Sequence, residues 1–213
     1  MAKSHNSIRA WSAVRGLTSQ GKQRRDKTWW AVALVLVVVG GLGYSCLFDR
    51  YAGYHQLLNA IEKGDAAAVD ALLASGVDPN RFPPPNIRED DQAPINAAAG
   101  TGNTKIVGLL INKGVDLQTT DSWGGPPMDV AARNDDVPMI AYLISRGAKV
   151  NDLGAHGSSA LYGAAVSGNS HALRYLLSEG ANPKTDMGGN SALDASRSLG
   201  KNECARLLEI ASK

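Results

Sequence analysis

Apolar and small residues alternate along most of the chain in a pattern that repeats. Residues 106–111 and 139–144 each place large apolar side chains at positions i, i+1, i+4 and i+5, which lie on one face of a helix. A short alanine-rich run precedes each of them. Pro94 and Pro127 stand just before these alanines and suit the first turn of a helix, where no amide hydrogen is needed. The pattern predicts pairs of helices, in which a helix with small side chains is followed by one with large apolar side chains.

A glycine closes each bulkier run, and its spacing sets the period. Gly114, Gly147 and Gly180 stand 33 residues apart, and Gly76 closes an earlier copy 38 residues before the first of them. Self-similarity at this period is typical of stacked units, each of which buries its apolar face only against its neighbours. Glycine also suits the left-handed C-cap of a helix, so the second helix of each unit is expected to end there.

The recurring phrases resemble the ankyrin repeat. Its Thr-Pro-Leu-His motif stands in degraded form at residues 93–96, 126–129, 159–162 and 191–194. The motif histidine is missing from every copy, which we expect to cost some hydrogen bonding between turns but not the fold. The resemblance implies an all-α ankyrin solenoid whose shortened last unit acts as a C-terminal cap. The repeats are expected at residues 51–80, 91–123, 124–156, 157–189 and 190–213.

A different pattern marks the N-terminal quarter of the chain. Residues 28–48 form a run of 21 without a charged side chain, which is long enough for a helix to span a bilayer. Trp29, Trp30 and Tyr44 lie near its ends, as interfacial aromatics do. We expect one transmembrane helix at residues 29–48. A helix buried in the stack is disfavoured because the stack would not cover it all round.

The charge distribution predicts the orientation of this span. Residues 1–28 hold seven basic side chains and one acidic one, a net of +6, whereas residues 49–63 have a net of zero. The positive-inside rule therefore predicts a basic cytoplasmic tail at residues 1–28. In a bacterium the ankyrin domain at residues 49–213 would lie in the periplasm, held at the inner membrane. Subtracting +6 from the total of +2 leaves −4 for that domain, so no nucleic-acid partner is expected.

Other interpretations of the N-terminal segment stay open. A cleaved signal peptide is one alternative, although the basic region is long for one and no clear small-x-small cleavage site follows the apolar run. Cys46 invites lipidation, although Tyr44 is too bulky for a lipobox. A mitochondrial presequence would place the repeats in the intermembrane space. The glycine cluster within residues 40–43 leaves room for an oligomerising helix.

Side chains that carry chemistry are sparse. His5, His55, His156 and His171 fall on different elements, without a cysteine or carboxylate at the spacing of metal ligands. Cys204 is expected to behave as a small apolar residue of the last helix. We therefore expect no enzyme, no metal, no cofactor and no small-molecule substrate.

A surface for a protein partner remains. In the resembled fold, partners contact the hairpin tips and the exposed side of the first helices. Trp123 is the expected hot spot, unless it folds down onto Pro126 and Pro127. An enlarged, proline-stiffened loop at residues 81–92 offers an apolar handle and acidic charge, or is a neutral insertion. The candidate partner-binding residues are Phe82, Glu89, Asp90, Asp91, Trp123, Arg133, Asn134, Asp136, His156, Val166 and Met187.

The chain also looks like bacterial proteins that join a short membrane anchor to a few ankyrin repeats. These include immunity proteins that neutralise toxins delivered by type VI secretion, often lipases. The resemblance implies a periplasmic immunity protein whose partner is a toxin. The alternative is a scaffold or protector of a resident periplasmic enzyme such as a catalase. An adjacent gene for a lipase would favour the first, and one for a catalase the second.

Overall fold

A computed structural model of the chain describes residues 53–80, 93–120, 124–154, 157–184 and 186–213. All of them belong to one compact unit, Asp49–Lys213. Residues 53–62 are helical. They are followed by α3 (Ala66–Ala74), α4 (Pro94–Gly100), α5 (Thr104–Asn112), α6 (Pro127–Arg133), α7 (Val137–Ser145), α8 (Ala160–Ser167), α9 (Ser170–Ser178), β1 (Asp186–Met187), β2 (Asn190–Ser191), α10 (Ala192–Ser198) and α11 (Asn202–Ala211).

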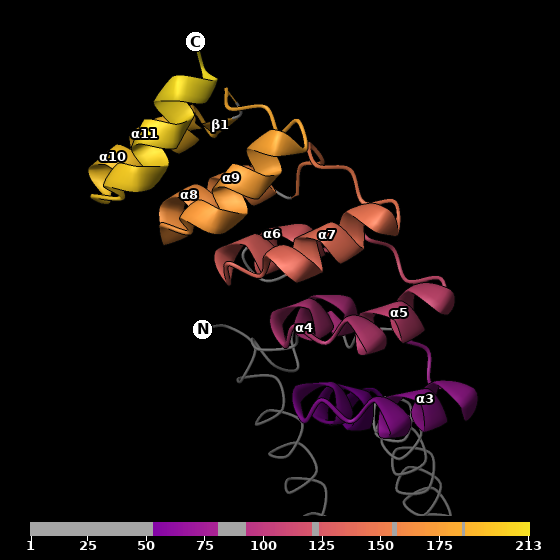
Figure 1. Ribbon diagram of the computed structural model, residues 1–213. Helices are drawn as coiled ribbons and strands as arrows, with labels where there is room; N and C mark the ends of the chain where they lie inside the picture. The colour runs from indigo at the N-terminus through magenta and orange to yellow at the C-terminus, as the bar shows by residue number, and fades with distance from the viewer. Residues whose placement is uncertain (1–52, 81–92, 121–123, 155–156, 185) are drawn as a thin grey trace, which may run out of the picture. The chain divides into compact units, whose positions relative to one another are not determined.

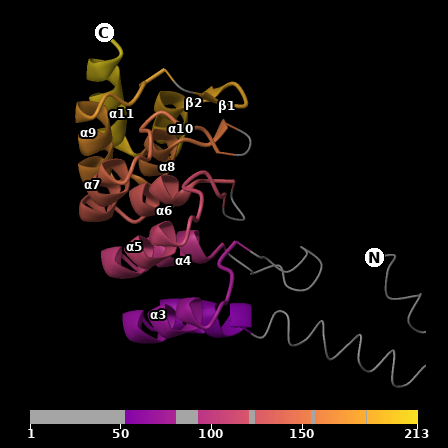
Figure 2. The ribbon, with the colours of Figure 1, turned by 90° about the vertical axis from the view of Figure 1, so that its right-hand side faces the viewer.

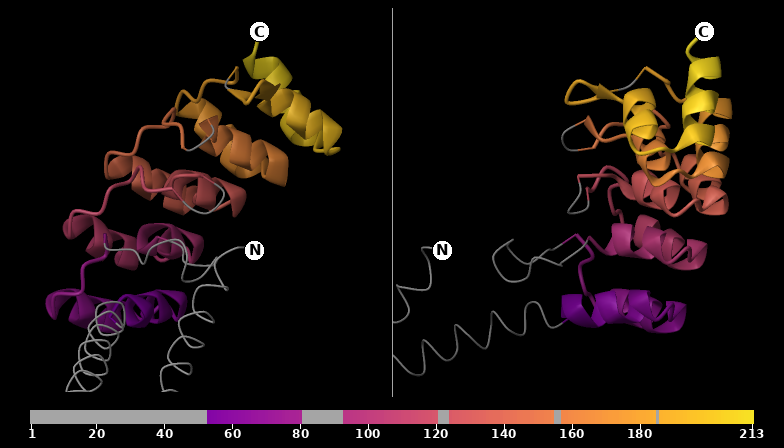
Figure 3. Two further views of the ribbon diagram at one scale, coloured as in Figure 1. Left: turned by 180° about the vertical axis from the view of Figure 1, so that it is seen from behind. Right: turned by 90° about the vertical axis from the view of Figure 1, so that its left-hand side faces the viewer.

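The predicted solenoid of helix pairs is confirmed. The first helices α4, α6, α8 and α10 pack in order along one row, and the second helices lie in a parallel row beside them (Figure 1). β1 and β2, which lie between α9 and α10, protrude beside the row of first helices (Figure 2). The two further views show the same order of helix pairs (Figure 3). The short antiparallel pair of β1 and β2 lies in the last connection between repeats, where the resemblance predicts a hairpin.

Local sequence explains where the helices begin and end. Pro94 and Pro127 occupy the first positions of α4 and α6, as predicted. The Asp136 side chain accepts a hydrogen bond from the Met139 amide at the start of α7, which satisfies a group without an acceptor inside the helix. Two residues past the end of α7, Gly147 has a φ of +99°. The expected left-handed glycine therefore follows this second helix.

The core lies between the two rows. Alanines of the first helices, Ala132 and Ala165 among them, are fully buried, because only a small side chain lets neighbouring helices approach closely. The second helices supply the volume with larger residues such as Leu110, Ile140 and Leu143, all fully buried. Each such side chain contributes roughly 1.5–3 kcal/mol relative to an exposed one. The alternating pattern predicts this difference in side-chain size between the first and second helices.

Polar residues occupy the position of the missing motif histidine. The Asn96 side-chain amide donates a buried hydrogen bond to the Gly125 carbonyl, 3.1 Å away in the next unit. Asp129, the counterpart of Asn96 in that unit, is 1% exposed. The lost histidine therefore costs less hydrogen bonding than expected, because Asn96 supplies a bond between units.

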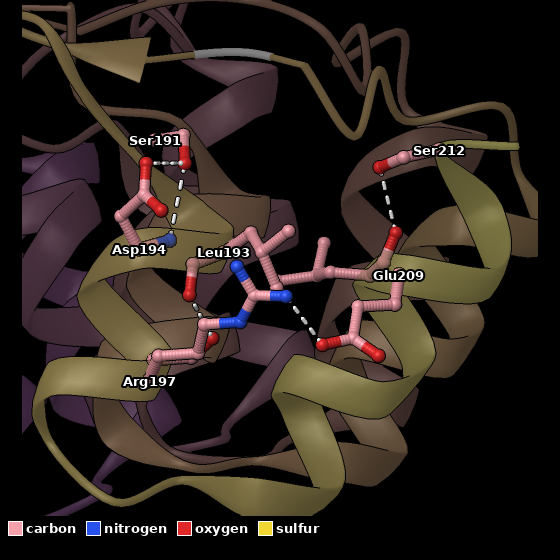
Figure 4. A network of polar contacts seen from close by, with 8 residues as sticks. Ser191, Leu193, Asp194, Arg197, Glu209 and Ser212 are labelled. Atoms are coloured by element: carbon pink, nitrogen blue, oxygen red, sulfur yellow. Dashed lines mark hydrogen bonds and ion pairs between the residues drawn. The ribbon is translucent and has the colours of Figure 1, made fainter.

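The last unit carries charged residues where inner units carry apolar ones. Arg197 stands at the repeat position of the buried Ala165, and Glu209 at that of Leu177. Their side chains, 54% and 45% exposed, form an ion pair of 2.6 Å from Arg197 Nη2 to Glu209 Oε1 across α10 and α11 (Figure 4). A hydrated ion pair opposes the docking of a further apolar repeat on this end, which is what a C-terminal cap requires.

The expected transmembrane helix at residues 29–48 lies outside the described residues. Within the part of the chain that the structure describes, no helix is both long and apolar enough to cross a bilayer.

Candidate functional site

The residues directly after Ala99, Ala132 and Ala165 in α4, α6 and α8, and after Arg197 at the same position of α10, form a row along the stack. We call this row the first-helix face. Matching repeat positions place eight residues in it: Gly100, Thr101, Arg133, Asn134, Val166, Ser167, Ser198 and Leu199. Helical periodicity turns these positions away from the second helices, which is why they escape the core.

Arg133 is the charged residue of this face, and it is tied to its own helix. Its Nη2 lies 3.0 Å from Asp129 Oδ2, one turn earlier in α6. The Arg133 side chain is 23% exposed and that of Asp129 only 2%. The Ser158 hydroxyl donates a second hydrogen bond to Asp129 Oδ2, at 3.3 Å. Arg133 therefore compensates a buried carboxylate and also reaches the surface.

Two glycines make room for the Asp129 carboxylate. A Cβ built on Gly125 would overlap Asp129 Oδ2 and lie 2.7 Å from Asp129 Cγ. A Cβ built on Gly163, in the facing helix α8, would overlap Asp129 Oδ1 and lie 3.0 Å from Cγ. The carboxylate thus fills the space that a side chain on either glycine would take. This packing holds α6 and α8 close together under the first-helix face.

Asn134 and Asp136 have structural contacts in addition to their predicted role. Asn134 is exposed at the end of α6, and its amide donates to the Gly100 carbonyl of the preceding unit at 3.3 Å. Asp136 accepts from the Met139 amide at 2.9 Å and caps α7. Neither contact tests whether a partner touches these residues, so their role in binding stays a prediction.

Val166 and Leu199 are the apolar residues of the first-helix face. Val166 is half-buried in α8. Leu199, at the end of α10, is 55% exposed and was missed as a candidate. Its repeat position is that of Asn134, so numbering the last unit against the others could have found it. Leu153, near the end of the third unit, is 51% exposed and is likewise absent from the candidates.

Most of the other predicted binding residues lie outside the described residues: Phe82, Glu89, Asp90, Asp91, Trp123 and His156. Met187 belongs to β1, where its backbone pairs with Asn190, and its side chain is not among those described.

The described side chains hold no group of three histidines, cysteines or acids that could bind a metal ion. Burial raises the pKa of the Cys204 thiol, and the nearby Glu203 raises it further. Desolvation likewise raises the pKa of the Tyr175 hydroxyl, with Glu179 adding to the effect. Both shifts favour the neutral form, which is the opposite of what an activated nucleophile needs.

Comparison with known proteins gives three matches. A family model described as ankyrin repeats in three copies matches residues 57–154, and a model of a single ankyrin repeat matches residues 156–186. Over 78 residues the chain is 37% identical to "Potassium channel KOR1" of Oryza sativa subsp. japonica. That match covers 36% of this chain and 8% of the channel. The chain thus spans a small part of that relative's length.

Proposed function

Because the chain belongs to the ankyrin repeat family, we propose that it is a membrane-tethered module that captures a protein in the periplasm. Ankyrin repeats are protein–protein interaction modules, and the described residues supply such a stack. The proposal adds the tether at residues 29–48, the compartment and the surface that is used.

One observation favours the first-helix face as that surface. Its residues differ from unit to unit, whereas the framework positions beside them repeat. The second alanine is Ala99, Ala132 and Ala165 in three successive units. The next two positions read Gly-Thr, Arg-Asn, Val-Ser and Ser-Leu. Packing requires identical framework residues because each unit meets a similar neighbour. Positions free of that requirement are where a partner's chemistry can be matched.

Two exposed leucine-sized residues allow a matched test of this surface. Leu199 lies on the first-helix face, and Ile210, 70% exposed, lies in the second helix α11. Neither is needed for the core, so a charge at either site should leave the fold intact. We expect Leu199→Asp to weaken capture of the partner from membranes by at least tenfold, and Ile210→Asp to leave it unchanged. Equal losses, or no loss at Leu199, would reject the first-helix face.

The most specific form of the proposal is an immunity protein against a toxin delivered by type VI secretion. A tethered inhibitor is concentrated at the membrane, where such a toxin would arrive. The test is to express the full chain in a sensitive recipient and challenge it with the toxin encoded beside its gene. Survival should rise, and Leu199→Asp should reverse the rise. Killing that proceeds unchanged would exclude immunity and leave the scaffold alternative.

A further inference from the structure

Asp135 stands at a position that is glycine in the other units. The other helix pairs are joined through Gly64, Gly102, Gly168 and Gly200, with φ between +69° and +82°. Asp135 stands at the same position with a φ of +56°, and among the described residues it is the one non-glycine with a positive φ. That conformation costs an L-residue roughly 1–2 kcal/mol, so the carboxylate must make compensating contacts.

Those contacts lie in the next unit. Asp135 Oδ1 accepts a hydrogen bond from the Ala172 amide at 2.8 Å, and Oδ2 lies 2.9 Å from His171 Nδ1. Ala172 is the third residue of α9, where an amide has no acceptor within the helix. Asp135 therefore caps a helix that belongs to the following repeat.

The residue expected to cap α9 is used elsewhere. Asn169 precedes the helix but makes no side-chain hydrogen bond to its amides. Its side-chain amide donates instead to the carbonyls of Ala132 at 2.9 Å and Arg133 at 2.7 Å. Both carbonyls belong to the last turn of α6, where acceptors lack partners within the helix. The third unit therefore supplies an acceptor to the first turn of α9, and the fourth unit supplies a donor to the last turn of α6.

The preceding interface carries only one half of this exchange, the hydrogen bond from the Asn134 side-chain amide to the Gly100 carbonyl of α4. There Asp136 caps its own helix α7. At the interface between the first and second units, Asn103 is the counterpart of Asn169. It accepts from the Ile106 amide at 3.2 Å in its own helix α5 and donates to the Gly64 carbonyl at 3.3 Å, but among the described residues the first unit does not cap α5 in return. The exchange through Asp135 and Asn169 thus distinguishes the interface between the third and fourth units.

We infer that this exchange couples the third and fourth repeats. Their helices then unfold together in the local opening reactions that hydrogen exchange detects. The Asp129 carboxylate, packed against Gly163 of α8, reinforces the same interface. Under the proposed function, on which this last step rests, the coupling would present Arg133 and Val166 to a partner at fixed spacing. A rigid surface loses less entropy on binding.

Hydrogen exchange on the full chain in detergent micelles tests the coupling without any partner. Asp135→Gly removes the carboxylate and keeps a residue that accepts the positive φ. We expect the amides of residues 170–173 to exchange about fivefold faster or more, the equivalent of a lost cap. Protection of α8 and α9 should then fall below that of α6 and α7. Asp135→Asn keeps an acceptor oxygen and should retain most of the protection.

Asp136→Ala is the matched control, because it removes a cap within one unit. It should speed exchange at the start of α7 and leave residues 170–173 unaffected. Unchanged exchange of α9 in Asp135→Gly would overturn the inference. So would an acceleration spread evenly over every repeat, because that pattern marks a loss of global stability. A failure of the chain to bind any periplasmic protein would reject the proposed function and leave these exchange rates untouched.

Discussion

Replacing Gly163 with alanine tests the close packing of the third repeat against the fourth. A Cβ at this position would overlap Asp129 Oδ1 and lie 3.1 Å from Arg133 Cγ. The Asp129 side chain is 2% exposed and paired with Arg133, so the carboxylate cannot move into water without breaking that pair. Either the ion pair is distorted or α6 and α8 move apart.

The size of the effect follows from three contributions. Overpacking a buried contact costs roughly 1–3 kcal/mol, and a weakened Arg133 partnership leaves a buried carboxylate less well compensated. Alanine in a helix regains about 0.5–1 kcal/mol relative to glycine. We expect a net loss of about 2–3 kcal/mol. At roughly 2–4 °C per kcal/mol for a domain of this size, Tm should fall by about 4–12 °C.

The same substitution at Gly100 is the control. A Cβ there would lie 3.6 Å from Val130 Cγ1 in ordinary contact, and Gly100 is exposed at the end of α4. Gly100→Ala should leave stability unchanged or raise it by about 0.5 kcal/mol. Thermal unfolding of the full chain in detergent, followed by far-UV circular dichroism, compares the two variants.

A double-mutant cycle identifies the cause. Asp129→Ala removes the atoms that the new methyl group would meet, so Gly163→Ala should cost much less in that background than alone. An equal cost in both backgrounds would show that Asp129 is not the obstacle. A Gly163→Ala protein as stable as Gly100→Ala would refute the packing argument itself.

Three other predictions concern the ends of the chain and its thiol. Replacing the end ion pair by Arg197→Ala with Glu209→Leu should expose an apolar end and cause concentration-dependent self-association in sedimentation experiments, whereas a monomeric variant would contradict the capping role. Because burial raises the pKa of the Cys204 thiol, stability in a Cys46→Ser background should fall as pH rises above about 8.5, and Cys204→Ala should flatten that slope. Alkaline phosphatase fused after Lys213 should be active in a bacterial host, and a cytosolic reporter active there instead would reverse the proposed topology.

The periodic features were predictable because every unit must pack against a similar unit. Small residues in first helices and large ones in second helices follow from one packing rule applied repeatedly. The glycines after the second helices follow from the positive φ that each copy of this turn adopts. Leu110 and Leu143 are buried for the same reason, in the same place, one repeat apart. Because the same pattern recurs in several repeats of one sequence, each repeat supports the interpretation of the others.

The contacts between units were harder to predict. Asp129 and Arg133 are four residues apart, a spacing that favours an ion pair on a helix, yet Arg133 was considered only as a surface residue. Burial of the carboxylate depends on Gly163, more than thirty residues away, having no side chain. The contact of Asp135 with Ala172 spans 37 residues. No local pattern distinguishes it from the glycine-like turn that the other units make.

Residues that depart from the repeat differ in what their side chains contact. Asp135 replaces a glycine, and its carboxylate accepts a hydrogen bond from the first turn of α9 in the next unit. Arg197 departs from alanine, and its charge meets Glu209. Structural needs explain both. Leu199 departs from the polar residues of earlier units and leaves more than half of its side chain in water. Exposed apolar area has a hydration cost that packing within the stack does not remove. A partner that covers Leu199 would remove that cost, and for this reason the Leu199→Asp variant tests the binding surface more directly than any variant of Arg133.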